Sequence, residues 1–229
     1  MRENLLVIVG IVFVFVIIYL VSTNFSCFRS NYVKPRNIPM TRQNGGKCQF
    51  LHNPKTAGSA IKQHIEKNLS QCVNYNMHEE FPEKNRITLM RDPYERLKSA
   101  IKYVQKAGHR GEYPYTSPQH RACYDLITST NLFSELLNTG RFEELCDFDV
   151  VFKPQKPYTD NSEILCYEDI DQFNDFVKDN CGCSTKDPLE PVNITKKDDS
   201  YFDDEDLFRV FASEKYAEDI KKYQEICGK

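Results

Sequence analysis

The chain opens with a long apolar segment and continues as a largely polar sequence. Residues 5–21 are apolar without interruption, and no charged residue follows until Arg29. Such a run reaches the lower limit for a helix that crosses a bilayer, so residues 5–24 are predicted to form one transmembrane helix. A cleaved signal peptide is the alternative. It is disfavoured because the run exceeds the ~7–15 apolar residues of a signal core and no Ala-x-Ala-like cleavage site follows.

The sequence after this helix divides into a stem and one domain. Residues 25–47 hold two prolines and a pair of glycines without apolar periodicity, which predicts a stem. Residues 1–4 would form a short cytosolic tail. Residues 48–229 are enough for one domain with a core and too few for two ordinary domains.

Apolar residues in this domain alternate between two patterns. Short apolar runs at residues 48–52 and 86–90, bounded by turn-forming or polar residues, predict two buried strands. Each run precedes apolar residues at helical spacing. These are Ile61, Ile65 and Leu69 after the first run, and Leu97, Ile101 and Val104 after the second. The alternation of strand and helix predicts an α/β fold, with a parallel sheet flanked by helices.

Weaker patterns follow along the rest of the chain. We expect one helix over residues 122–137, short strands at 149–152 and 163–167, a helix at 170–177 and a long final helix at 203–226.

The composition indicates that the chain can form a hydrophobic core and bears on the cellular compartment in which it folds. Fifteen Phe and thirteen Tyr residues exclude a disordered chain, and a net charge of −3 gives no reason to expect a nucleic-acid partner. All nine cysteines follow the apolar segment, as do Asn-x-Ser/Thr sequences at Asn24, Asn68 and Asn193. Both features favour an oxidising, glycosylating lumen, whereas the basic residues after the apolar run favour the cytosol by the positive-inside rule.

The cysteines allow several pairings. An odd count leaves at least one thiol without an intramolecular partner, and the sequence does not fix the connectivity. The spacing of Cys181 and Cys183 differs from that of a zinc knuckle, so no metal site is expected.

The segment between the first strand and helix, residues 52–59 (HNPKTAGS), suits an anion. Small residues let backbone N–H groups converge there, the helix N-terminus adds a partial positive charge, and Lys55 adds a full one. It is not a Walker A loop, because Lys55 precedes Gly58. An ordinary tight turn is the alternative interpretation.

The segment at residues 90–99 (MRDPYERLKS) begins the helix after the second strand. Asp92 and Pro93 are typical N-cap and first-turn residues, with Glu95 completing a capping box. That cap does not explain Arg91, which lies at the strand end where open parallel sheets bind ligands.

The same helix has a polar face next to its apolar one. Helical spacing places Arg96, Ser99 and Tyr103 on it. Arg91 and Ser99 could therefore hold one anion from either side of the turn, and two anion sites on successive strand ends suit a nucleotide with phosphates at both ends of its ribose.

Residues 50–61 (FLHNPKTAGSAI) and 87–103 (ITLMRDPYERLKSAIKY) together resemble the two-part cofactor signature of the membrane-bound carbohydrate sulfotransferases, closest to the heparan sulfate 2-O- and 6-O-sulfotransferase branch. Softer matches lie at residues 154–155, 164–168, 193–197 and 216–223. The resemblance implies a P-loop-like α/β fold and the co-substrate 3′-phosphoadenosine 5′-phosphosulfate. It also implies a single-pass type II Golgi membrane glycoprotein with a lumenal catalytic domain acting on a glycan acceptor.

The resemblance also implies roles for individual residues. The 5′-phosphosulfate would be held by Lys55, Thr56, Ala57, Gly58 and Ser59, and the 3′-phosphate by Arg91 and Ser99. Lys55 would neutralise charge in the transition state.

The catalytic base would be a histidine. His78 holds the position of the family's catalytic histidine, and an imidazole suits proton transfer at lumenal pH. Glu79 or Glu80 could orient it or act as the base instead. His52 belongs to the anion-binding segment, and His64 is expected on a helix surface.

The acceptor is less constrained than the co-substrate. The chain has no Trp, so Tyr113, Tyr115 or Phe133 would have to stack on a sugar. Residues 108–121 are basic and aromatic, and could contact an acidic glycan or form an exposed loop.

Two other functions stay open at this point. A nucleotide-dependent phosphotransferase is disfavoured by the missing Walker lysine and by a lumenal location. A membrane-tethered protein of the same fold could bind nucleotide or glycan without catalysis.

Overall fold

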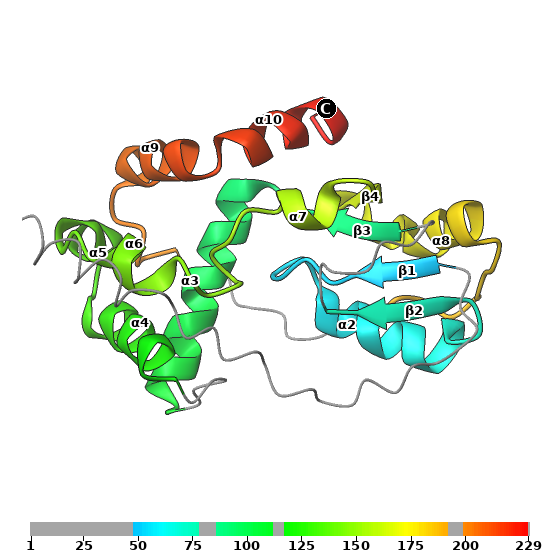
Figure 1. Ribbon diagram of the computed structural model, residues 1–229, viewed down its shortest axis with the longest axis horizontal. Helices are drawn as coiled ribbons and strands as arrows, with labels where there is room; N and C mark the ends of the chain where they lie inside the picture. The colour runs from blue at the N-terminus through cyan, green and yellow to red at the C-terminus, as the bar shows by residue number, and fades with distance from the viewer. Residues whose placement is uncertain (1–47, 78–85, 112–116, 192–198, 229) are drawn as a thin grey trace, which may run out of the picture. The chain divides into compact units, whose positions relative to one another are not determined.

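A four-stranded parallel sheet forms the centre of the fold in a computed structural model of the chain (Figure 1). The structure describes residues 48–77, 86–111, 117–191 and 199–228. The strand order is β2-β1-β3-β4. The strands are β1 (Cys48–Leu51), β2 (Val73–Asn76), β3 (Arg86–Met90) and β4 (Glu163–Cys166). The predicted α/β class, with helices flanking a parallel sheet, is confirmed.

The register aligns the carboxyl ends of the three strands that precede the candidate site. Leu51 at the end of β1 pairs with Asn76 on β2 and with Thr88 on β3. Residues that follow β1, β2 and β3 therefore start from one edge of the sheet.

Two of the strand predictions need correction. β2 was not predicted, because its sequence, VNYN, alternates apolar and polar residues over only four positions. The predicted strand at residues 149–152 is wrong, since this segment is a turn. Its backbone closes on itself as Phe152 N donates to Asp149 O (3.0 Å) and Asp149 Oδ1 accepts from Val151 N (3.1 Å).

One face of the sheet packs against α2 (Gly58–His64), the π-helical turn η1 (Ile65–Leu69) and α8 (Phe173–Cys181). Alternate strand residues supply the apolar contacts, so Phe50 and Ile87 lie fully buried against these helices. A short 3-10 helix, η2 (Tyr167–Gln172), joins β4 to α8.

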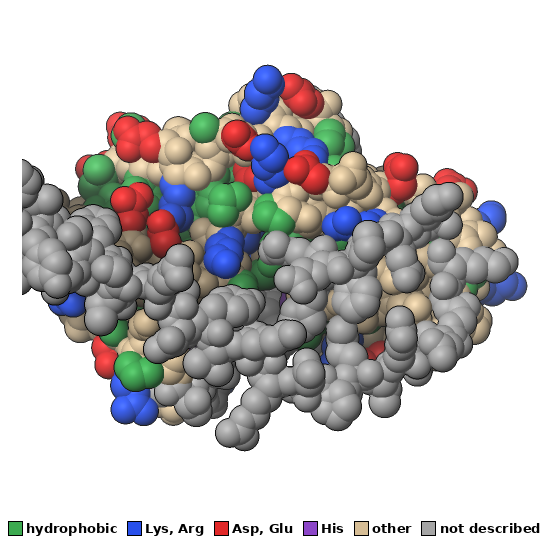
Figure 2. Space-filling model, in the orientation of Figure 1, with side chains coloured by type: hydrophobic (Ala, Val, Ile, Leu, Met, Phe, Trp, Pro, Cys, Tyr) green, Lys and Arg blue, Asp and Glu red, His purple; other side chains and the backbone are tan. Residues whose placement is uncertain are grey.

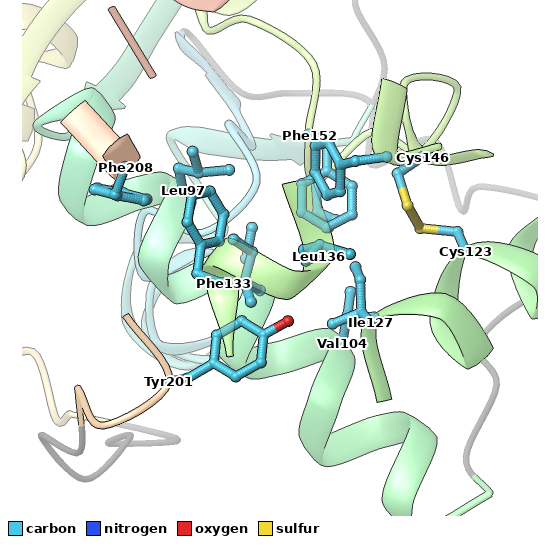
Figure 3. Packing of buried hydrophobic residues seen from close by; sticks show 14 of the residues in the cluster. Leu97, Val104, Cys123, Ile127, Phe133, Leu136, Cys146, Phe152, Tyr201 and Phe208 are labelled. Carbon is cyan, nitrogen blue, oxygen red and sulfur yellow. A yellow bond between two sulfur atoms is a disulfide. The ribbon is translucent and has the colours of Figure 1, made fainter. Parts of the chain in front are cut away.

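A second apolar cluster is built from helices, and α3 connects it to the end of β3 (Figure 1). Phe133 is fully buried in this cluster, beside Phe208 (Figure 3). Its ring also contacts those of Phe202 and Phe211. The helices are α3 (Pro93–His109), α4 (Pro118–Ser129), α5 (Phe133–Asn138), α6 (Phe142–Cys146), α9 (Glu205–Lys215) and α10 (Ala217–Ile226).

Two predicted helices are each divided in the structure. The helix expected over residues 122–137 becomes α4 and α5, because Thr130 has an extended backbone. The final helix is interrupted at Tyr216, whose hydroxyl donates to Phe152 O (2.7 Å) and so ties the break to the turn before the short helix α7 (Lys156–Thr159).

Four disulfides pair all the cysteines in the described part of the chain. They join Cys48 to Cys181, Cys72 to Cys183, Cys123 to Cys146 and Cys166 to Cys227. Cys181 and Cys183 therefore fasten the end of α8 to the residues that begin β1 and precede β2. Cys27 lies outside the described residues.

The predicted tail (1–4), transmembrane helix (5–24) and stem (25–47) also lie outside the described residues. Within the described ranges, no helix combines the length and apolar character needed to cross a membrane.

Candidate anion-binding site

The turn between β1 and α2, residues 52–57, is the first part of the candidate site. Lys55 and Ala57 have φ angles of 68° and 62°, the left-handed region that few side chains adopt. Between them, Thr56 is fully buried, and its hydroxyl donates to Asn53 O (2.6 Å). The Thr56 hydroxyl thus stabilises the turn, which presents the backbone of Lys55 and Ala57.

A buried amide pair links this turn to the end of β3. Asn53 Nδ2 donates to Leu89 O (2.9 Å) and to Gln155 Oε1 (2.8 Å). Gln155 then bonds the backbone of Arg91 twice, since its Nε2 donates to Arg91 O (2.8 Å) and its Oε1 accepts from Arg91 N (3.1 Å). Gln155 therefore fixes the positions of both strand ends relative to each other.

Helix α10 holds Gln155 in turn. The carboxylate of Asp219, 1% exposed, accepts from Gln155 N (2.6 Å) and from Lys156 N (3.0 Å). Acidic and basic side chains lie side by side on the surface around α10 (Figure 2), including the exposed pair of Lys156 and Glu218. The sequence signalled these positions only as soft family matches, and gave no reason to expect this contact.

Arg96 has a structural role in this site. Its side chain is 1% exposed, its Nε donates to Pro54 O (3.0 Å) and its Nη2 donates to Lys153 O (2.8 Å). The guanidinium thus supports the β1–α2 turn from behind while adding positive charge to it.

Two residues of the polar face of α3 contact the β1–α2 turn. Arg96 contacts Pro54, and seven residues further the Tyr103 ring lies 4.3 Å from Lys55 Nζ. Since positions three, four and seven apart share one helix face, the half-buried Ser99 lies on the side of α3 that faces Lys55.

Two half-buried cations, Lys55 and Arg91, meet at this edge of the sheet. Arg91 Nη1 donates to Lys55 O (3.2 Å), and its guanidinium lies 4.5 Å from the Tyr167 ring centroid. The pKa of Lys55 is lowered to about 8, first by burial and then by the charges of Arg91, Arg96 and Lys106. An anion would relieve this mutual repulsion, so the arrangement favours binding of negative charge.

His52 contributes packing volume to the site and no positive charge. Burial lowers its pKa to about 4, helped by the charges of Lys55 and Lys62, so the imidazole is neutral near pH 7. Its ring lies against Gly58, where a Cβ atom would overlap the imidazole. Of the other predicted contacts in this segment, Ala57 is half-buried and Ser59 is exposed at the start of α2.

The predicted base, His78, lies outside the described residues, as do Glu79 and Glu80. His78 is nevertheless two positions after Asn76, the last residue of β2. Of the three candidate residues Lys55, Arg91 and His78, the structure describes Lys55 and Arg91, which follow the neighbouring strands β1 and β3.

Two expectations about other candidate residues are wrong. His64 is 5% exposed rather than on the surface, because its ring bonds Asn174 Oδ1 (2.8 Å) and Asn68 Nδ2 (3.2 Å) between α2 and α8. Phe133 is fully buried in the helical cluster, so it has no face to offer a sugar. Tyr113 and Tyr115 lie outside the described residues.

The segment at residues 108–121 is partly helical. His120 belongs to the first turn of α4, where its Nδ1 lies 2.6 Å from the hydroxyl of Ser117, the N-cap.

The described side chains of the chain include no group of three or more His, Cys, Asp or Glu residues arranged to hold a metal ion.

Comparisons with models of known protein families, with characterised proteins and with solved structures found no match to this chain.

Proposed function

We propose that the chain is a carbohydrate O-sulfotransferase that moves the sulfuryl group of 3′-phosphoadenosine 5′-phosphosulfate to a hydroxyl of a glycan. The observation that carries the proposal is the pair of cations at neighbouring strand ends, where Arg91 bonds the backbone of Lys55 and helps to lower its pKa. Open parallel sheets bind ligands at this edge, and the co-substrate carries anionic groups at both ends of its ribose.

Each residue of the site has a role in this proposal. Lys55 and the backbone of residues 56–59 hold the 5′-phosphosulfate, and Arg91 with Ser99 holds the 3′-phosphate. The bound co-substrate supplies an activated sulfuryl group and a phosphate leaving group. As in phosphoryl transfer, negative charge on the transferring and leaving oxygens must be neutralised, and Lys55 supplies that charge. His78 takes the proton of the attacking sugar hydroxyl, with Glu79 or Glu80 as the alternative base.

The proposed setting is the Golgi membrane, with residues 5–24 as a type II anchor and the domain in the lumen. The four disulfides support an oxidising compartment, where such bonds persist.

Binding is tested by a thermal shift of the full-length chain with 3′-phosphoadenosine 5′-phosphate. We expect the nucleotide to raise the melting temperature, because a ligand that binds only the folded state stabilises it. Lys55→Ala should abolish this shift, whereas Lys67→Ala, at an exposed position on η1, should retain it. Absence of any shift in the wild type would overturn the proposal.

Catalysis is tested by sulfate transfer from the radiolabelled co-substrate to a panel of desulfated glycans. We expect transfer by the wild type and none above background with His78→Ala. Lys55→Ala should lower the rate by about 10²–10³, the scale for one preorganised charge-stabilising donor. Nucleotide binding without transfer would indicate a binding protein, and magnesium-dependent ATP turnover would indicate a phosphotransferase.

A further inference from the structure

Both cations of the candidate site lie against tyrosine rings. Lys55 Nζ is 4.3 Å from the centroid of the Tyr103 ring, and the Arg91 guanidinium is 4.5 Å from that of Tyr167. Both distances are within the range of a cation–π interaction, in which the negative face of the ring attracts the charge.

The contact with the Tyr103 ring matters because the charges around Lys55 disfavour its protonated form. Among the described residues, the charged and titratable groups that act on Lys55 are Arg91 at the end of β3 and Arg96 and Lys106 on α3, with His52 beside it at the end of β1. Arg91, Arg96 and Lys106 all oppose protonation of Lys55, and His52 is neutral.

The main chain of Lys55 is held independently of its side chain. Its carbonyl accepts from Arg91 Nη1, and the preceding Pro54 carbonyl accepts from Arg96 Nε. These bonds fix the backbone and not the ammonium, whose contact with the Tyr103 ring keeps it beside α3.

We propose that Tyr103 is a positioning residue that holds the Lys55 ammonium on the polar face of α3 and keeps it charged for the incoming anion. The inference rests on the proposed function in taking Lys55 as the residue that meets the 5′-phosphosulfate. Tyr167 supports Arg91 in the same way, but a guanidinium stays protonated in any environment. Loss of Tyr103 therefore changes how binding depends on pH, and loss of Tyr167 does not.

The decisive measurement is the pKa of Lys55 in the full-length chain without ligand. It is read from the rate of acetylation by acetic anhydride as a function of pH, with the modified peptide quantified by mass spectrometry. Tyr103→Leu removes the ring and keeps apolar bulk over Lys55. We expect it to lower the pKa of Lys55 by roughly half a unit, the equivalent of one exposed cation–π interaction. Tyr103→Phe keeps a ring and should leave the pKa as in the wild type.

A second measurement compares the Kd for 3′-phosphoadenosine 5′-phosphate at pH 6.5 and pH 8.5. We expect Tyr103→Leu to weaken binding about two- to threefold more at pH 8.5 than at pH 6.5, relative to the wild type, because fewer Lys55 side chains remain charged. Tyr167→Leu should weaken binding equally at both values and leave the pKa of Lys55 unchanged.

The outcomes separate this inference from the proposed function. An unchanged pKa of Lys55 in Tyr103→Leu, or the same lowering in Tyr103→Phe, would overturn the positioning role whether or not nucleotide binds. A pKa of Lys55 that is lowered in Tyr103→Leu and unchanged in Tyr103→Phe supports the positioning role. If the pKa of Lys55 changes in this way but the wild type does not bind the nucleotide, the sulfotransferase proposal is wrong. The positioning of Lys55 by Tyr103 is still supported in that case.

Discussion

Gly58, the first residue of α2, packs closely against the β1–α2 turn. Its backbone is outside the left-handed region, so conformation alone would allow alanine. The imidazole of His52 fills the space where a Cβ atom would lie. Packing against a neutral histidine, rather than a requirement of the backbone, therefore explains the glycine.

Replacing Gly58 tests this explanation. Gly58→Ala should destabilise the fold by about 1–3 kcal/mol through overpacking, although alanine normally favours a helix over glycine. In Gly58→Ala with His52→Ala the overlap is gone, so the double variant should be more stable than the sum of the two changes indicates. Urea unfolding of the four chains measures the coupling, and Ser59→Ala, exposed at the next position, is the control. Additive changes would contradict the packing argument.

The low pKa of His52 makes a prediction about pH. The folded chain binds a proton at His52 only near pH 4, whereas an unfolded histidine does so near its ordinary pKa of 6.5. Between these values the unfolded state holds more protons, so the free energy of unfolding should fall as the pH decreases from 6.5 to 4. His52→Asn removes this contribution. Chemical unfolding at several pH values should give a steeper decrease for the wild type than for the variant, and equal slopes would refute the assignment.

At the scale of helices and strands, the sequence predicts elements that have a local apolar pattern, and it does not predict contacts between distant residues. β1 and β3 were predictable because each is a short, mainly apolar segment beside turn-forming or polar residues, and Arg91 followed from its place at a strand end. The contact between Gln155 and Asp219 was not, because it joins residues 64 apart in the sequence and no periodicity marks either. The support that Arg96 gives the turn likewise depends on contacts with residues 42 and 57 positions away.

Helix α10 is expected to support the site through Asp219. Asp219→Ala leaves Gln155 N and Lys156 N without their buried acceptor, and each unsatisfied group costs about 1–3 kcal/mol. We expect a loss of about 2–4 kcal/mol in urea unfolding, with weaker nucleotide binding because Gln155 no longer fixes Arg91. Glu218→Ala, at the neighbouring exposed position, should change neither property. Equal unfolding midpoints for the two variants would show that α10 does not hold the turn.

For the molecule as a whole, three disulfides reinforce the two apolar clusters from within, and Cys166–Cys227 joins β4 to the residue after α10. Cys123–Cys146 lies within the helical cluster (Figure 3), whereas the bonds from Cys181 and Cys183 secure α8 against the sheet. The cysteine count predicted an oxidising compartment but not this connectivity, since pairing depends on which cysteines the fold brings together.

The two bonds at the end of α8 close overlapping loops, which leads to a prediction about stability. Cys48–Cys181 spans 133 residues and Cys72–Cys183 spans 111. While the second bond is intact, breaking the first frees only a loop of roughly 26 residues in the unfolded chain. That is close to the 23-residue span of Cys123–Cys146. In the chain-entropy model, Cys48→Ala/Cys181→Ala and Cys123→Ala/Cys146→Ala should each cost about 3.5 kcal/mol.

Urea unfolding of the two double variants under non-reducing conditions measures both losses. The comparison is matched because all four cysteines are buried, so replacement by alanine removes similar apolar volume. If Cys72–Cys183 did not form, Cys48–Cys181 would close a loop of roughly 110 residues, because Cys123–Cys146 bypasses 23 of the 133. Loss of Cys48–Cys181 would then cost about 1.5 kcal/mol more than loss of Cys123–Cys146. Equal losses support the overlapping pair, and a gap of that size would show that the two bonds do not act together.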